Sequence, residues 1–198
     1  DSGVGGHQTE WSFNNDARLE WQNWLKLKNE TVVRLNELLG LRFWGQVVSS
    51  FDEVPMPMHA PTAHNPALLL DWARFSSDTI VAFVSMQAEV LREMTPDIPI
   101  TTNLRALQRR FDHFDIAKVL DFVSVESNAV IKSKAAELAC DIDVLRSLKK
   151  DGVRTPDGDC GFWVIEQKAG QVNWQDVNSL VRPGVIRLFT YQLLSRGA

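Results

Sequence analysis

Several features that mark other classes of protein are scarce in this sequence of 198 residues. It has only 2 cysteines, Cys140 and Cys160, too few for a disulfide framework or a four-ligand zinc site, so we expect two free thiols in a reducing compartment. No apolar run approaches the ~20 residues of a membrane span, and no charged and then apolar leader opens the chain. Acidic residues (25) outnumber basic ones (21), which leaves no basic stripe for nucleic acid. These absences predict a cytoplasmic protein without membrane or nucleic-acid partners.

What the sequence does contain is enough apolar material for a folded core. Hydrophobic residues make up 44% of the chain, and prolines number only 8, which excludes an intrinsically disordered protein. At roughly 150 residues per domain, the length predicts a single domain over residues 1–198.

Tryptophan is unusually frequent, with 7 residues. Its flat apolar face and single donor suit both core packing and contact with sugar rings. Trp21, Trp24 and Trp72 fall at helical spacing and are predicted to lie in the core, whereas Trp44 and Trp174 fall in loops. For the two loop tryptophans, sugar stacking and core packing both stay open.

The first half of the chain has helical periodicity. Asn14–Asp16 offer caps for a first helix, Asn29 offers one for a second helix that Gly40 closes, and Asn65-Pro66 begins a long helix that Pro96 ends. One face of that long helix carries seven residues at helical spacing: Leu69, Trp72, Ile80, Phe83, Gln87, Leu91 and Met94.

The second half alternates between strand and helix patterns. β-Branched and apolar runs predict strands at 98–103, 120–125 and 162–166, and periodic segments predict helices from 112, over 132–150 and over 185–196. In the last two helices the residues expected to face inward are Leu138, Ile142, Leu145, Leu148, Ile186, Phe189 and Leu193. Such alternation is typical of parallel βα units.

The number of strands is too small for a closed sheet. A (β/α)8 barrel of the TIM type needs eight strands, and this α/β chain offers three clear ones. We therefore expect a partial barrel with three to four parallel strands and long helices. Its open edges predict a homo-oligomer or a complementing chain, because soluble proteins cover exposed edges.

Polar side chains follow each predicted strand. Asn103, Glu126 and Glu166 stand at the three carboxyl ends, where parallel βα units gather their reactive groups. Glycosidases use two such carboxylates, one as the nucleophile and one as the general acid and base. The alternative interpretations are that Glu126 merely begins a solvated loop and that a basic neighbour satisfies Glu166.

Motifs for other chemistries are missing from the sequence. It contains no Gly-x-Ser-x-Gly elbow, no phosphate-binding loop and no dinucleotide fingerprint. We expect neither a metal nor a cofactor, because the histidines are scattered without partners at ligand spacing: His7, His59, His64 and His113.

Six segments of the sequence resemble segments of the β-galactosidases of glycoside hydrolase family 42, and they follow one another in the same order as in that family. The most specific are Phe-Trp-Val-Ile-Glu-Gln at 162–167 and Val-Asn-Trp at 172–174, and the others lie at 65–78, 100–103, 120–124 and 183–184. The resemblance implies the middle part of a (β/α)8 catalytic barrel that hydrolyses terminal β-D-galactosides with retention, usually in trimers.

The resemblance also implies roles for particular residues. Glu166 matches the family's catalytic nucleophile, and Trp44 and Trp174 match tryptophans that line its galactose site. The opening Asp-Ser-Gly-Val-Gly-Gly-His resembles the segment that carries the acid/base glutamate, but the matching position here is Gly3, preceded by Ser2. A glycine cannot transfer a proton. Residues 9–15 also lack the cysteine cluster that often binds zinc in the family.

The leading hypothesis is therefore a retaining β-galactosidase-like chain that is incomplete as it stands. Glu166 would be the nucleophile, Glu126 a substitute acid/base, and Asn103 a substrate-binding residue beside Trp44 and Trp174. One alternative is a non-catalytic sugar-binding or structural remnant that self-associates. Another is an inert fragment whose fold depends on self-association.

Overall fold

The computed structural model describes residues 13–105, 110–127, 135–149, 161–171 and 180–198. The chain divides into two compact units, one of residues 8–80 and one of residues 1–7 with 81–198, and the division falls within a long helix. The single domain over residues 1–198 stays a prediction. None of the described helices is long and apolar enough to cross a membrane.

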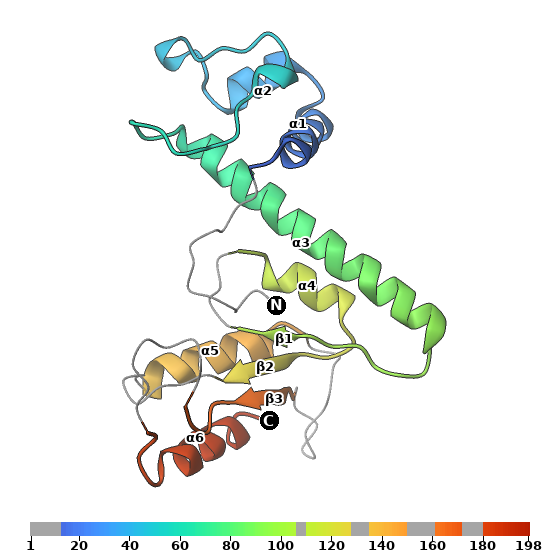
Figure 1. Ribbon diagram of the computed structural model, residues 1–198, viewed down its shortest axis with the longest axis vertical. Coiled ribbons are helices and arrows are strands. Elements are labelled where there is room, and N and C mark those ends of the chain that lie inside the picture. The colour runs from blue at the N-terminus through green and yellow to red at the C-terminus, as the bar shows by residue number, and fades with distance from the viewer. Residues whose placement is uncertain (1–12, 106–109, 128–134, 150–160, 172–179) are drawn as a thin grey trace. The chain divides into compact units, whose positions relative to one another are not determined.

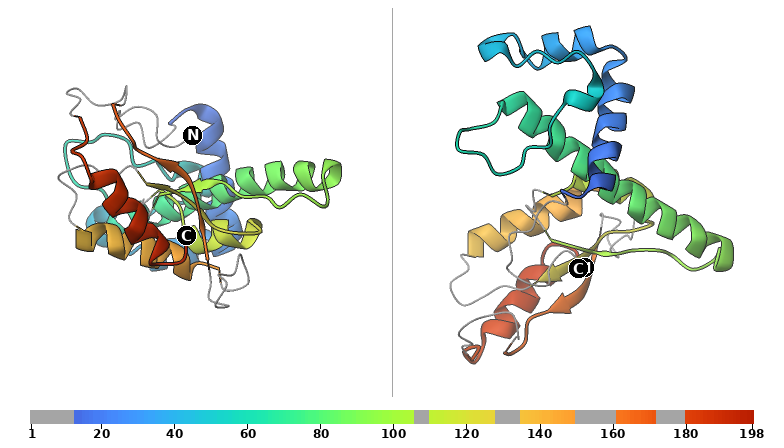
Figure 2. Two further views of the ribbon diagram at one scale, coloured as in Figure 1. Left: turned by 90° about the horizontal axis from the view of Figure 1, so that it is seen from below. Right: turned by 45° about the horizontal axis from the view of Figure 1, so that its top comes forward.

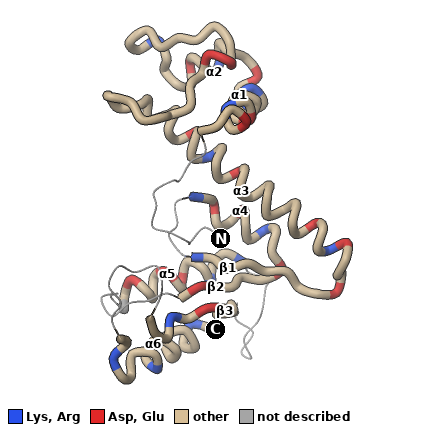
Figure 3. Tube along the Cα trace, in the orientation of Figure 1, with Lys and Arg blue, Asp and Glu red and all other residues tan. Residues whose placement is uncertain are grey.

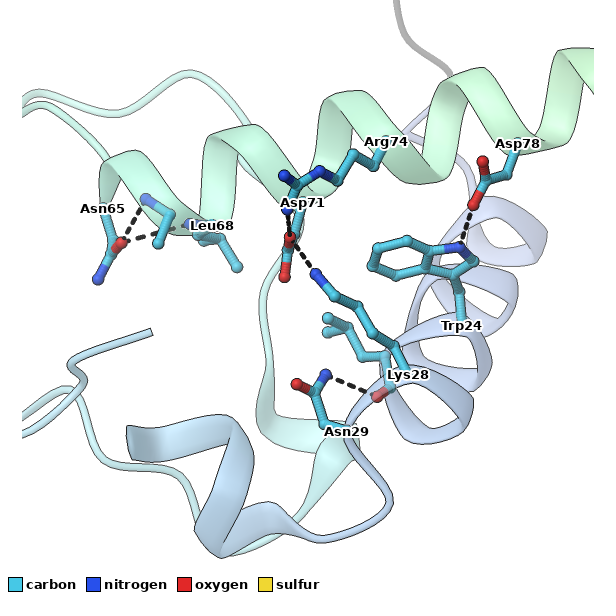
Figure 4. Close-up of polar contacts among 10 residues, drawn as sticks. Trp24, Lys28, Asn29, Asn65, Leu68, Asp71, Arg74 and Asp78 are labelled. Atoms are coloured by element: carbon cyan, nitrogen blue, oxygen red, sulfur yellow. Dashed lines mark hydrogen bonds and ion pairs between the residues drawn. The ribbon is translucent and has the colours of Figure 1, made fainter. Parts of the chain in front are cut away.

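The first unit is helical. It holds α1 (Asn15–Asn29), α2 (Val32–Leu38), two 3-10 turns (Phe43–Gly45 and Phe51–Glu53) and the beginning of α3 (Pro66–Met94). Asn14 caps α1 by accepting the amide of Ala17 at 2.8 Å, as its sequence predicts. The side-chain oxygen of Asn65 likewise accepts the Ala67 amide at 2.8 Å at the beginning of α3 (Figure 4).

The prediction that Asn29 caps the second helix is wrong. Asn29 is the last residue of α1, and its buried side chain donates to the Leu25 carbonyl at 2.8 Å. Glu30 then adopts a positive φ of 62°, which turns the chain so that Thr31 becomes extended and caps α2. A cap needs that extended conformation, and Asn29 is helical.

Aromatic rings form the core of this unit. Trp21 and Trp72 are fully buried, as predicted, and meet edge to face with ring centroids 5.2 Å apart. Trp24 is only partly buried, and its indole N–H donates to an Asp78 carboxylate oxygen at 2.8 Å (Figure 4). The ring is therefore anchored at the rim of the core.

The second unit is built on three parallel strands, as the alternation predicts. They are β1 (Asn103–Leu104), β2 (Ser124–Ser127) and β3 (Trp163–Gln167), in the order β1-β2-β3 (Figures 1 and 2). The connecting helices are α4 (His113–Val119) and α5 (Ala135–Ser147), and α6 (Val185–Leu194) follows β3. Ile142, Leu145 and Leu148 of α5 and its following turn are buried, as expected.

The strands begin later than predicted, most of all β1. Ile98 lies in a turn closed by its amide on the Thr95 carbonyl, and Pro99 has no amide to offer a neighbouring strand. The Ile100 amide donates to the Asp121 side chain at 2.6 Å, so it does not hydrogen-bond to a neighbouring strand. Only the end of the predicted 98–103 segment joins the sheet.

Two predicted helix faces are exposed more than their apolar character suggests. The seven residues at helical spacing on α3 do share a face, but of them only Trp72 is buried. On α6, Phe189 and Leu193 face inward as predicted, whereas Ile186 is 38% exposed. On α3 the most exposed apolar residues of the face lie in the second half of the helix, at Phe83, Leu91 and Met94.

Candidate active site

The three polar residues predicted at strand ends do lie together. Asn103 is on β1, Glu126 on β2 and Glu166 on β3, at the same edge of the sheet. The side-chain amide of Asn103 donates to Oε2 of Glu126 at 3.0 Å, and Glu126 is opposite Glu166 in the register of the two strands. Glu126 is half-buried, while Asn103 and Glu166 are exposed.

A bulge in β3 sets which residue faces Glu126. Val125 pairs with Val164, but the next pair is Glu126 with Glu166, so Ile165 is an extra residue in β3. Without it, Glu126 would lie opposite Ile165. Bulges next to active sites re-aim a side chain, and here the bulge brings two carboxylates into register. The sequence gives no sign of the bulge, because no glycine marks it.

Hydroxyl groups hold β1 against β2 just before this edge. Ser124 is fully buried, and its hydroxyl donates to the Thr102 carbonyl at 2.8 Å and lies 2.9 Å from the Thr101 hydroxyl. Thr101 also donates to the Phe122 carbonyl at 2.8 Å. These bonds fix the position of Asn103 relative to Glu126.

An ionic clamp supports the same two strands from their other end. The Asp121 carboxylate accepts the Ile100 amide at 2.6 Å and the Arg92 guanidinium at 3.0 Å, and Arg92 also donates to the Val119 carbonyl at 2.8 Å. The Ile100 amide, together with Arg92, lowers the pKa of Asp121 against the opposing effect of burial. We call these four residues the Asp121 clamp.

Sequence reasoning missed the polar residues just beyond Glu166. The Gln167 side-chain oxygen accepts from Thr190 of α6 at 3.4 Å, and Lys168 is 7% exposed, with its amide on the Ser127 carbonyl at 3.0 Å. The position of Lys168 just after the predicted strand at 162–166, two residues beyond Glu166, is the signal that could have found it. Lys168 thus adds a buried polar group directly after β3.

Trp44 belongs to the other compact unit. It lies in the turn Phe43–Gly45, is 82% exposed, and stacks on Phe43 with centroids 4.8 Å apart and planes at 20°. Its φ of 54° is in the left-handed region, which costs a bulky residue on the order of 1–3 kcal/mol. Of the two interpretations of Trp44, core packing is therefore wrong for this unit.

Other expected site features lie outside the described residues. These are Trp174 of the predicted galactose site, and Ser2 and Gly3 of the predicted acid/base segment. Across the ranges that the structure describes, no three His, Cys, Asp or Glu side chains gather as a metal site would require.

Parallel βα units with carboxylates at their carboxyl edge are the arrangement of (β/α)8 barrels, a class that includes many glycoside hydrolases. The profile of glycoside hydrolase family 42, described as "Beta-galactosidase", matches residues 1–198. This chain belongs to that family.

Relatives and solved structures agree with this assignment. A β-galactosidase of Geobacillus kaustophilus is 35% identical over 187 residues, which cover 94% of this chain and 27% of that protein. The β-galactosidase structure from Halorubrum lacusprofundi matches with a TM-score of 0.85 and 29% identity, over 98% of this chain and 30% of that one. The β-galactosidase structure from Bacillus circulans sp. alkalophilus matches with a TM-score of 0.83 and 30% identity, over 95% of this chain and 28% of that one.

The chain thus spans about three tenths of the length of these relatives. Its three parallel strands with their helices are part of a (β/α)8 barrel, which confirms the predicted fold class.

Proposed function

We propose that this chain carries part of the catalytic site of a retaining β-galactosidase that acts on terminal β-D-galactosides. One observation carries the proposal: the bulge in β3 sets Glu166 opposite Glu126, which Asn103 holds by a hydrogen bond of 3.0 Å. Neighbouring strands lie about 4.8 Å apart. Retaining glycosidases need their two carboxyl groups about 5 to 5.5 Å apart, which residues in register on adjacent strands can reach.

In this mechanism Glu166 is the nucleophile. Its carboxylate oxygen attacks the anomeric carbon of galactose while the bond from that carbon to the leaving oxygen breaks. Protonated Glu126 gives its proton to the leaving oxygen and becomes a carboxylate. It then takes a proton from water, whose oxygen attacks the anomeric carbon and releases Glu166 from the glycosyl ester.

Glu126 takes the acid/base role because the position that matches the family's acid/base is Gly3, which has no carboxyl group. Asn103 orients the Glu126 carboxyl through its side-chain amide and contacts the sugar hydroxyls next to it. By the family resemblance, Trp174 supplies a flat apolar face for the galactose ring.

A second candidate function is sugar binding without turnover. The observation that favours it is the exposed stack of Phe43 and Trp44, in a turn where Trp44 has a positive φ of 54°. Exposed aromatic faces bind sugar rings without any carboxylate chemistry.

Trapping of the covalent intermediate tests the proposed mechanism. Incubation with a 2-fluorogalactosyl reagent that carries a nitrophenolate-type leaving group, which needs little protonation, should label the protein once, on Glu166, as read by peptide mass spectrometry. Glu166→Gln should abolish the label, and the matched control Glu93→Gln, on the exposed face of α3, should keep it. A folded protein that gains no label, but whose tryptophan fluorescence responds to galactose, supports the binding function instead.

Substrate choice tests the role of Glu126. General acid assistance is worth about 10²- to 10⁴-fold, so Glu126→Gln should lower lactose hydrolysis by that factor and affect a nitrophenyl galactoside less. Azide should restore turnover of the nitrophenyl substrate in this variant by attacking the glycosyl ester in place of activated water. Equal losses on both substrates would remove Glu126 from proton transfer.

The free thiol of the chain and the edges of its sheet bear on its cellular setting and its partners. We infer a cytoplasmic setting, supported by the free thiol of Cys140, which is exposed on α5. We also infer that the chain associates with copies of itself or with a complementing chain, since both edges of its described sheet are open. We propose neither nucleic acid nor a membrane as a partner.

A further inference from the structure

Two polar side chains stand directly after the paired carboxylates of the candidate site. Ser127 follows Glu126 as the last residue of β2, and Gln167 follows Glu166 as the last residue of β3. Ser127 and Gln167 are partners in the register of the two strands. Successive side chains of a strand point to opposite faces, so this pair shares the face of the sheet opposite to the carboxylates. That face is the one toward α6, because the Gln167 side-chain oxygen contacts Thr190 of that helix.

Both side chains end in a buried polar atom without a hydrogen bond. Ser127 is only 5% exposed, and within the described ranges neither its Oγ nor Nε2 of Gln167 has a hydrogen-bond partner. The two atoms do not bond each other either, although the Lys168 amide joins their strands by donating to the Ser127 carbonyl at 3.0 Å. Nearly all buried polar groups of proteins are paired, because an unpaired one loses its bonds to water. Two such atoms on register partners therefore indicate one shared ligand.

The chemistry of the two atoms selects the ligand. Nε2 of Gln167 only donates, whereas the Ser127 hydroxyl both donates and accepts, so the ligand must accept at least one hydrogen bond. Charged residues occur in β2 and β3, but Ser127 and Gln167 are themselves uncharged (Figure 3). A buried anion needs a positive charge bound to it, and neither side chain supplies one. A water molecule needs no charge, and buried waters commonly bridge polar groups that lack other partners.

We propose that Ser127 and Gln167 bind one buried water molecule, which joins the end of β2 to the end of β3 behind the candidate site. Nε2 of Gln167 donates to the water oxygen, and the Ser127 hydroxyl forms the second bond. Through the contact of Gln167 with Thr190, the water also ties both strand ends to α6. The water site is independent of the proposed catalytic function. Its consequence rests on that function: the water fixes the spacing of the two strands where Glu126 and Glu166 stand one residue earlier.

A crystal structure of the chain that shows ordered water tests the site directly. We expect density for one water within about 2.7–3.2 Å of both Ser127 Oγ and Gln167 Nε2. The same position should be empty of that water in Gln167→Met, which keeps the length of the side chain but has no amide. A direct hydrogen bond between the two side chains, or another polar group of the chain in the place of the water, would overturn the proposal.

Urea unfolding tests whether one ligand links the two residues. Ser127→Ala and Gln167→Met each remove one bond to the water, so each should lower the unfolding midpoint. The double variant should lose less than the sum, because the second change finds the water already released, and we expect a coupling of about threefold or more in the unfolding equilibrium constant. The matched control is Gln87→Met on the exposed face of α3, which should leave the midpoint unchanged. A midpoint that rises with Ser127→Ala would indicate an unpaired hydroxyl, and additive losses would indicate two separate sites; either result overturns the proposal.

The consequence for the nucleophile has a readout of its own. A misplacement of about 1 Å can cost on the order of 100-fold in rate, so Ser127→Ala should lower the maximal rate at which the 2-fluorogalactosyl reagent labels Glu166 by about tenfold or more. The reagent concentration that gives half of this rate should stay the same, which separates a misplaced nucleophile from lost sugar binding. Gln87→Met should be labelled like wild type, and a Ser127→Ala chain labelled at the wild-type rate would overturn the role of the water in spacing. A wild-type chain that is never labelled would contradict the proposed function alone, because the crystal structure and the unfolding measurements judge the water site without any substrate.

Discussion

Removing the charge of the Asp121 clamp should loosen the sheet that carries the site. Asp121 lies in the turn before β2, and its carboxylate accepts the Ile100 amide, before β1, and the guanidinium of Arg92 on α3. Arg92 also donates to the Val119 carbonyl at the end of α4. Asp121→Asn keeps an oxygen for the amide but loses the charge on both bonds.

The size of the effect follows from exposure. Hydrogen bonds to charged groups are worth about 1.5–3 kcal/mol each when buried. The Asp121 side chain is 43% exposed, so water replaces much of each interaction, and exposed pairs are worth at most about 1 kcal/mol. The two bonds together give about 1–2 kcal/mol. With an m-value of about 2 kcal/mol per molar urea, the midpoint should fall by roughly 0.5–1 M.

The pH dependence separates this cause from a general loss of packing. Because the pKa of Asp121 is lowered from 3.8 by folding, its stabilisation is present above that value and disappears as pH falls through the folded-state pKa. Urea unfolding of wild type and Asp121→Asn should therefore differ at pH 7 and converge in strong acid. Asp97→Asn, exposed in the same connection, is the control. A difference that persists unchanged in acid would contradict the clamp.

Two further changes probe other parts of the fold. Asp141→Asn should raise stability at neutral pH, because burial, and then the nearby Glu137, raise the pKa of Asp141 above 3.8. This gain should shrink as pH falls through the raised pKa and vanish below 3.8. Urea unfolding at several pH values measures it. Trp21→Ala should lower the free energy of unfolding of the helical unit by about 3–5 kcal/mol, since Trp21 is fully buried against Trp72. Thermal unfolding followed by near-UV circular dichroism measures the loss, and a much smaller loss would contradict a central role of Trp21 in this core.

Local signals in the sequence predicted the helices better than the strands. Asn65-Pro66 begins α3 where expected, because a cap is satisfied by amides two and three residues away. The start of β1 is decided by Asp121, a side chain 21 residues later that binds the Ile100 amide. Such a contact exists only in the folded chain, so no periodicity in residues 98–103 reports it.

The candidate site shows the same division. The rule that polar residues gather at the carboxyl ends of parallel strands predicts Asn103, Glu126 and Glu166 at one edge of the sheet, where they lie in the structure. It could not find the bulge at Ile165, because that depends on how β3 pairs with β2 rather than on any residue of β3 alone. The buried Lys168 was missed for a related reason, since lysine is mostly exposed in proteins.

The exposed apolar residues of α3 show what periodicity can establish. Spacing of about 3.6 residues identified a real face that includes Phe83 and Met94, but it says nothing about what covers that face. In the first half of α3 the covered side is defined by Trp72 and Phe75, which pack on the rings of α1. In the second half, the apolar side that looks outward is bordered by acids. Periodicity therefore establishes that a face is apolar, whereas the contacts of the folded chain decide which part of that face is buried.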